Sequence, residues 1–163
     1  MQMKLTHYSS DKIYDLDKRN YHKNHFKNPS KPNGIWFSVE GGYGWKEWCI
    51  DEDFRLESLI YKHDIILKKE CSVIILSNPK DIFDFSDRFQ SRHLSKETFL
   101  FSEWTPPSQI DWLKVEEEYQ GIIITPYQPE CRFSPKSSWY YGWDCASGCI
   151  WDINAIEVFK PEE

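Results

Sequence analysis

Ten residues near the C-terminus, 147–156, constrain the fold of this chain more than any other stretch. Ser147 and Gly148 are small, turn-forming residues, and most of the residues after them are apolar, so the stretch predicts a turn that runs into a buried strand. Two earlier segments, 5–10 and 34–38, resemble it because polar residues sit at the edges of apolar strands. We expect a functional cleft where these strands meet.

The chain has 163 residues and a mass of 19.6 kDa, which suits a single domain over residues 1–163 with a sizeable core. The first ten residues contain no apolar signal-peptide core, and no window of the sequence approaches the length of a membrane span. The five cysteines are odd in number and irregularly spaced, which favours a reducing compartment over a disulfide framework. We therefore expect a soluble cytoplasmic protein with no membrane partner.

The net charge of −6 argues against passive nucleic-acid binding, which depends on many Lys and Arg contacts to phosphates. The positive charges are nevertheless uneven, because seven basic or His residues cluster between positions 18 and 31. This cluster is either a solvated loop or a cationic loop over an anionic ligand such as a pyrophosphate. Its members are Lys18, Arg19, His22, Lys23, His25, Lys27 and Lys31.

Patterns of apolar residues predict an α+β fold with mixed, largely antiparallel β-sheets that form a cleft, flanked by a few short helices. Strands are predicted at 4–8, 35–39, 60–68, 72–76 and 122–125, and a final strand is predicted in the C-terminal stretch 147–156. The continuous apolar run at 122–124 is typical of a strand buried on both faces. Long loops are expected at 17–33 and 128–144, with irregular structure at 94–107.

Three helices are expected between these strands. One covers residues 45–54 and packs through its tryptophans, and a second covers 79–89 behind the Ser77-Asn78 pair, which can cap it. The third begins at the N-cap Asp111, and Gly121 is placed where a left-handed residue ends a helix.

Aromatic residues make up 17% of the chain, and most of them must form the core. Those beside glycines and short polar residues have room for a ligand: Trp36, Tyr43, Trp45 and the run at 139–143. Cys145 and Cys149 form one close pair, whereas structural zinc sites usually show two, so we predict buried, unreactive thiols and no metal. Neither a P-loop nor a Rossmann glycine pattern is present in the sequence.

The three strand segments together resemble motifs of ADP-ribosyltransferases of the diphtheria-toxin and poly(ADP-ribose) polymerase type. The first strand of that family carries a His, a small residue and a Ser or Thr, to which residues 7–9 are similar. A later Gly-x-Tyr-Phe-Ala strand resembles residues 34–38, with Trp36 in place of Tyr. A strand near the end, Glu-x-Ile-Val-Tyr-Asp, is similar to residues 147–152, and the three motifs occur in the same order.

The resemblance implies NAD as substrate and a role for each matching residue. His7 would hydrogen-bond the adenosine ribose, the backbone at Tyr8 would hold the nicotinamide amide, and Ser9 would support that contact. Trp36 and Tyr43 would wall the nicotinamide ring, as flat aromatic side chains do. The implied reaction loses nicotinamide through an oxocarbenium-like transition state, which a nearby negative charge favours. ADP-ribose would then be transferred to a macromolecule, or NAD would simply be degraded.

Ser147 stands where transferring members of the family place a catalytic Glu, and a hydroxyl does not ionise as a carboxylate does. The RES-domain NAD-degrading toxins are similar in having a Ser at the start of the final strand. Asp144, three residues upstream of Ser147, and Glu40, just past the second strand, are possible substitutes for the missing Glu. The candidate catalytic residues are therefore Asp144, Ser147 and Glu40.

A non-enzymatic protein is the other class that the sequence suits. A small, acidic, aromatic-rich bacteriophage or bacterial accessory protein would inhibit or modify a protein partner through its aromatic loops, with residues 128–143 supplying the contact surface.

Overall fold

The computed structural model describes residues 3–16, 31–91 and 109–163, which form one seven-stranded sheet. The strand order is β4-β5-β6-β2-β1-β3-β7. Only the β4–β5 pair is parallel among these neighbours, so the predicted α+β class with a mixed, largely antiparallel arrangement is confirmed as a single sheet. The strands are β1 (Leu5–Ser9), β2 (Ile35–Val39), β3 (Tyr61–Leu67), β4 (Val73–Leu76), β5 (Gly121–Ile124), β6 (Ser147–Ile150) and β7 (Ile156–Pro161).

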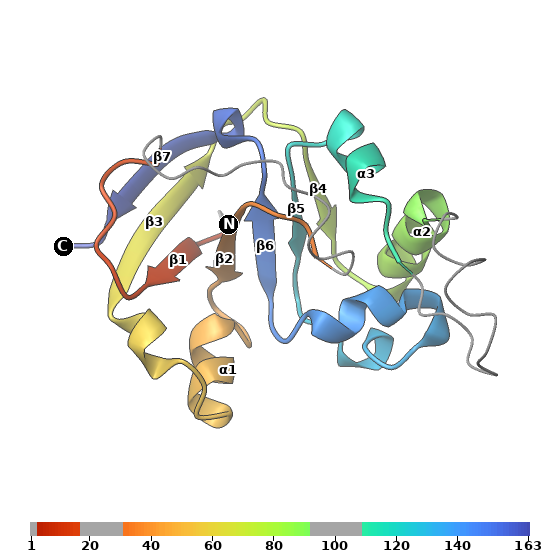
Figure 1. Cartoon of the computed structure of the whole chain (residues 1–163), viewed down its shortest axis with the longest axis horizontal. Helices are drawn as coiled ribbons and strands as arrows, with labels where there is room; N and C mark the ends of the chain where they lie inside the picture. The colour runs from red at the N-terminus through yellow and green to blue at the C-terminus, as the bar shows by residue number, and fades with distance from the viewer. Residues whose placement is uncertain (1–2, 17–30, 92–108) are drawn as a thin grey trace.

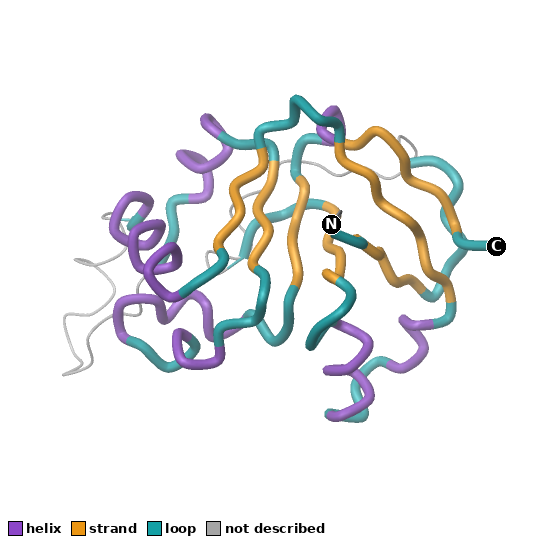
Figure 2. The backbone as a smooth tube through the Cα atoms, turned by 180° about the vertical axis from the view of Figure 1, so that it is seen from behind, coloured by secondary structure: helices purple, strands orange, loops and turns teal. Residues whose placement is uncertain are grey.

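The described helices are short and lie at two places around the sheet. Helices α2 and α3 and the 3₁₀ segment η3 gather beside β4 and β5, on the other side of the molecule from β3 and β7 (Figure 1). Helix α1 extends from the end of β2, and the view from behind shows it projecting beyond the sheet (Figure 2). The α-helices are α1 (Trp45–Asp51), α2 (Pro79–Phe89) and α3 (Trp112–Glu118); the 3₁₀ segments are η1 (Leu56–Leu59), η2 (Pro129–Cys131), η3 (Pro135–Gly142) and η4 (Ile153–Ala155).

Two of the helices begin as their capping residues predict. The Asn78 side chain accepts a hydrogen bond from the backbone N–H of Asp81 at 3.0 Å, and Pro79 occupies the first turn of α2. The Asp111 side chain accepts from the backbone N–H of Lys114 at the start of α3. Each cap satisfies a backbone donor that the first turn of a helix leaves without a partner.

Strand β5 is buried on both faces, as its continuous apolar run predicts. Ile122 and Ile124 face an aromatic core with α2, α3 and η3, whereas Ile123 faces a second, mainly aliphatic core that includes Phe37 and Ile150. Alternate residues of one strand therefore serve two cores, since successive strand side chains point to opposite faces.

The predicted role of Gly121 as a helix-ending residue is wrong. Helix α3 ends at Glu118, and Gly121 is the first residue of β5. A Cβ atom there would lie 2.3 Å from Ile150 Cδ1 and 2.8 Å from the carbonyl oxygen of Cys149. Close approach of β6, and not backbone conformation, explains this glycine.

Other boundaries also differ from the predictions. Strand β6 ends at Ile150, and the Asp152 side chain accepts from the backbone N–H of Asn154 to start η4, so a separate strand, β7, completes the sheet. Helix α1 stops at Asp51 rather than at residue 54. The expected loop at 128–144 contains η2 and η3, whose aromatic side chains are part of the core.

The expected irregular stretch at 94–107 and most of the loop at 17–33 lie outside the described residues, as do all members of the basic cluster except Lys31. Among the helices that are described, none combines the length and the apolar character that crossing a membrane requires.

Candidate functional site

The first two strands separate soon after they begin to pair. Strand β1 pairs with β3 along its whole length, from Leu5 to Ser9. Its ladder with β2 has just two residue pairs, Leu5 with Val39 and Thr6 with Ser38. Beyond these pairs β1 and β2 diverge (Figure 1), and we call this divergence the β1–β2 fork.

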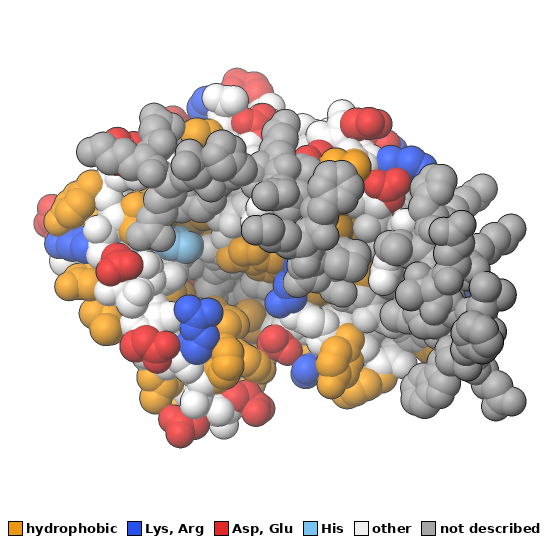
Figure 3. All heavy atoms as spheres, viewed as in Figure 1, with side chains coloured by type: hydrophobic (Ala, Val, Ile, Leu, Met, Phe, Trp, Pro, Cys, Tyr) orange, Lys and Arg blue, Asp and Glu red, His pale blue; other side chains and the backbone are white. Residues whose placement is uncertain are grey.

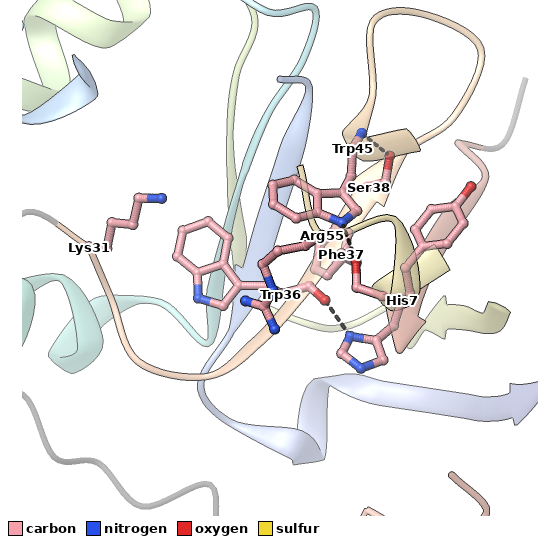
Figure 4. Close-up of a pocket in the computed structure, with 9 residues that line it drawn as sticks. His7, Lys31, Trp36, Phe37, Ser38, Trp45 and Arg55 are labelled. Atoms are coloured by element: carbon pink, nitrogen blue, oxygen red, sulfur yellow. Dashed lines mark hydrogen bonds between the residues drawn. The ribbon is translucent and has the colours of Figure 1, made fainter. Parts of the chain in front are cut away.

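A pocket of about 330 Å³ lies at the β1–β2 fork. Its volume falls at the lower end of the range of roughly 300–1,000 Å³ that small-molecule sites occupy. Hydrophobic and basic side chains both reach the surface on the face that Figure 1 views (Figure 3). The described residues that line the pocket are His7, Tyr8, Lys31, Trp36, Phe37, Ser38, Trp45, Arg55 and Ser58 (Figure 4).

Two indole rings of the pocket are held in place by neighbouring aromatic rings. Trp36 meets the buried Trp143 edge to face, with 4.9 Å between ring centroids. Trp45 stacks on Trp48 at 5.1 Å and its indole N–H donates to Ser58 Oγ at 3.4 Å. Such packing fixes flat apolar walls in advance, which lowers the entropic cost of binding a planar ring.

Ser38 fixes helix α1 to the sheet beside the pocket. Its Oγ accepts a hydrogen bond from the backbone N–H of Trp45 at 2.9 Å. A Cβ atom on Gly44 would lie 2.4 Å from that Oγ, so the close approach depends on the glycine. Trp45 therefore enters the pocket at a position set by a strand residue.

His7 bridges the β1–β2 fork. Its Nδ1 lies 2.6 Å from the carbonyl oxygen of Trp36, and a carbonyl only accepts, so Nδ1 carries a proton and donates this hydrogen bond. The ring centroid of His7 is 5.7 Å from that of the buried His63. His63 accepts from the backbone N–H of Ile13 at 2.8 Å through Nε2, which places its proton on Nδ1 as well.

Tyr8 connects the pocket to a carboxylate. Its hydroxyl donates to Glu40 Oε1 at 2.9 Å. Burial raises the pKa of Tyr8 above its usual value, and the hydrogen bond to Glu40 raises it further. The phenol is therefore protonated at neutral pH and holds Glu40 just outside the pocket lining.

Three of the predicted site residues, His7, Tyr8 and Trp36, line the same pocket. They come from two sequence motifs on the neighbouring strands β1 and β2. Trp45, identified from the sequence as an aromatic beside glycines, lines the pocket with them.

Two other residues predicted to bind the cofactor lie elsewhere among the described residues. Ser9 is buried, and its Oγ accepts from the backbone N–H of Asp11 at 3.1 Å. The hydroxyl of Tyr43 donates to Asp51 at 3.0 Å, and its ring packs near Tyr127. Trp45, rather than Tyr43, is thus the aromatic that accompanies Trp36.

Ser147 and Asp144 are also absent from the described pocket lining. Ser147 pairs with Ser38 across β2 and β6, but its Oγ donates to the carbonyl oxygen of Cys145 at 3.1 Å. Asp144 forms a partly buried ion pair with Arg132 at 3.0 Å. Burial raises the pKa of Asp144, while Lys31 and Arg132 act in the opposite direction. Among the described residues, Glu40 is the one candidate catalytic residue whose side chain is hydrogen-bonded to the side chain of a pocket residue, Tyr8.

Sequence patterns did not identify Arg55 as a site residue. It lies in the charged segment after α1, which has no helical or strand periodicity. Arg55 and Asp53 both adopt positive φ angles, 46° and 48°, which is uncommon outside glycine. A pair of non-glycine left-handed residues has no sequence signature that would have marked this turn.

The described residues contain no group of three or more His, Cys, Asp or Glu side chains arranged to hold a metal ion. Four of the five cysteines are buried, and burial raises the pKa of each: Cys49, Cys131, Cys145 and Cys149. These side chains are accordingly protonated thiols packed in the core.

Comparisons with models of protein families, with curated proteins and with solved structures find no match to this chain.

Proposed function

We propose that the pocket at the β1–β2 fork binds NAD and that the protein cleaves the bond between nicotinamide and ribose. The observation that carries the proposal is the meeting of His7 and Trp36 in one pocket, joined by a hydrogen bond of 2.6 Å. They belong to two different motifs, and the resemblance gives each a separate role in binding the same dinucleotide. Their presence in one pocket therefore supports NAD as the ligand.

The lining of the pocket suits the parts of this substrate. Trp36 and Trp45 provide flat walls for the nicotinamide ring. His7 lines the pocket with an imidazole ring, a group that hydrogen-bonds ribose hydroxyls. The backbone at Tyr8 lies on the diverging strand, where it contacts the nicotinamide amide in the proposed complex.

Glu40 is the carboxylate that we assign to the cleavage step. The carbon–nitrogen bond breaks with its electron pair remaining on nicotinamide, water or an acceptor bonds to the ribose carbon, and a proton is released. Positive charge develops on the ribose, and a carboxylate one hydrogen bond behind Tyr8 stabilises it. The acceptor in a transfer reaction would be a macromolecule, and hydrolysis would yield free ADP-ribose.

The test is incubation of the purified protein with NAD, followed by chromatographic detection of nicotinamide and a search for ADP-ribose additions by mass spectrometry. H7A and W36A are expected to abolish nicotinamide release while remaining folded, and E40Q to reduce it. E117Q, which alters an exposed carboxylate on α3, is the matched control and should have no effect. Absence of nicotinamide release by the wild type, with no thermal shift on adding NAD, would refute the proposal.

A second candidate function is binding of a protein partner by an accessory or inhibitor protein of bacterial or bacteriophage type. It is favoured by a pair of exposed aromatic side chains in residues 128–143. Phe133 is 77% exposed and Tyr141 is 57% exposed, and their ring centroids lie 5.9 Å apart. The Arg132 guanidinium lies over both rings. Aromatic and Arg side chains dominate binding energy at many interfaces, so loss of biological effect in F133A/Y141A, with H7A unaffected, would favour this function.

A further inference from the structure

We propose that Arg55, together with Lys31, recognises phosphate groups, so that the pocket selects phosphorylated nucleotides over uncharged nucleosides. This inference rests on the proposed function in one respect, since it assigns the diphosphate of NAD to the cationic side chains of the same pocket. It extends that function by naming a specificity residue outside the three motifs that resemble the family.

The described lining of the pocket differs in charge from the rest of the chain. The chain as a whole is acidic, with 26 Asp and Glu against 20 Lys and Arg. The described lining of the pocket has the opposite sign, because it includes Lys31 and Arg55 and no Asp or Glu. A cationic pocket in an acidic protein attracts an anion by the local field rather than by net charge.

The backbone at Arg55 has an uncommon conformation. Its φ and ψ of 46° and 43° are left-handed, and it directly precedes η1. Asp53, two residues earlier, is also left-handed. Non-glycine residues in this region are strained, and such strain is concentrated at ligand sites. Arg55 lines the pocket together with Trp36 and His7, and Figure 4 shows its side chain among the residues drawn there.

Arg55 forms a weak ion pair with Glu57. Its Nε lies 3.9 Å from Glu57 Oε1, and the two side chains are 63% and 66% exposed. An exposed pair at this distance contributes little and does not neutralise the guanidinium. A phosphate presents oxygens that the planar guanidinium can bind in pairs, which the distant Glu57 does not.

Lys31 supplies the second cation from another part of the chain. Its Nζ lies 5.3 Å from the centroid of the Trp36 ring, and Figure 4 shows its side chain at the edge of the pocket. The pocket thus combines the flat indole ring of Trp36 with the cationic side chains of Lys31 and Arg55. This arrangement fits a ligand in which a planar base or nicotinamide is joined to phosphates.

The test is isothermal titration calorimetry with ADP-ribose, which carries the diphosphate but no nicotinamide, and with adenosine, which carries neither. We expect the wild type to prefer ADP-ribose. R55Q should weaken ADP-ribose binding by about tenfold or more, as expected for loss of a charge-assisted hydrogen bond, and leave adenosine binding unchanged. R55K should recover part of the affinity.

Two further variants separate recognition from fold and from overall charge. R55G removes the guanidinium but adopts a positive φ without strain, so it should lose ADP-ribose affinity while its melting temperature does not fall. R88Q removes one positive charge from the exposed Arg88 on α2, which pairs with Glu118, and should bind ADP-ribose as the wild type does.

Several results would overturn the inference: no ADP-ribose binding by the wild type, equal affinity for adenosine, or equal losses in R55Q and R88Q. Its failure is distinguishable from failure of the proposed function. NAD cleavage with an unchanged KM in R55Q would remove the phosphate role and keep the enzyme. ADP-ribose binding that depends on Arg55, without nicotinamide release, would keep the phosphate role and remove the enzyme.

Discussion

The Nδ1 nitrogen of His7 and the carbonyl oxygen of Trp36 lie 2.6 Å apart, where the backbone pairing of β1 and β2 has already ended. The hydrogen bond from the His7 side chain thus takes the place of the next backbone pair between the two strands. A further backbone pair would bring the strands together and close the space between them. The side-chain hydrogen bond connects the strands and leaves the pocket open.

H7A tests this relationship. Loss of one partly buried hydrogen bond should lower the free energy of unfolding by about 1 kcal/mol. H63A is the comparison, because His63 is fully buried and bonded at both ring nitrogens, and should lose about 3 kcal/mol. Urea denaturation measures both, and equal losses would make His7 a core residue rather than a pocket residue.

Gly148 should tolerate no side chain. An added Cβ would lie 2.5 Å from Phe37 Cζ and 2.6 Å from the carbonyl oxygen of Ile122, so G148A forces β2, β5 and β6 apart. We expect a loss of about 3 kcal/mol in unfolding free energy. G42A, where nothing lies within 4 Å of the added Cβ, should change stability by less than about 0.5 kcal/mol. A stable G148A would contradict the described packing of Phe37 against β6.

Alkylation should distinguish one cysteine from the others. Cys71 is partly exposed, whereas burial raises the pKa of Cys145 to about 12 and that of Cys149 well above its ordinary value. Iodoacetamide at about pH 8 attacks the thiolate, so the folded protein should be modified at Cys71 first and all five cysteines should react in urea. Peptide mass spectrometry locates the label, and early modification of Cys145 would contradict its burial.

Glu162 should contribute a small, pH-dependent stabilisation. The hydrogen bond from Lys4, at 2.7 Å, lowers the pKa of Glu162 below its ordinary 4.5. A lowered pKa in the folded state means stability that is present above the ordinary pKa and is lost as the pH falls through the folded value. Because Lys4 is largely exposed, E162Q should cost no more than about 1 kcal/mol near pH 7.

The difference between E162Q and the wild type should shrink toward zero as the pH falls through the lowered folded-state pKa of Glu162, because the carboxyl is then protonated in both the folded and the unfolded state. Urea denaturation over a series of pH values from about 7 downward measures it. A difference that persisted at low pH would point to packing instead of charge.

Local signals predicted the elements whose causes are local. Asn78 and Pro79 start α2, and Asp111 starts α3, because a cap acts on backbone groups within one turn. Gly121 was misassigned because its cause is distant, namely the approach of Cys149 and Ile150 from another strand. Short-range patterns contain no information about which strand will lie alongside.

The candidate site divides in the same way. His7 and Trp36 stand in strand motifs and were identified, since strand position fixes their location on the sheet. Ser147 is expected beside them because it matches the position of a catalytic Glu in the third motif; it does pair with Ser38 in the neighbouring strand, but its hydroxyl bonds to its own chain at Cys145. Arg55 was missed because an uncommon backbone conformation, and not a pattern of residue types, aims it at the pocket.

The short ladder between β1 and β2 divides the sheet into two halves, β4-β5-β6-β2 and β1-β3-β7, that share two residue pairs. A ligand in the β1–β2 fork touches both halves at once, through Trp36 on one and His7 on the other. A bound ligand therefore links β1 to β2 where their backbone pairing has ended. Backbone amide protons of β1 and β2 should exchange with solvent more slowly when the pocket is filled.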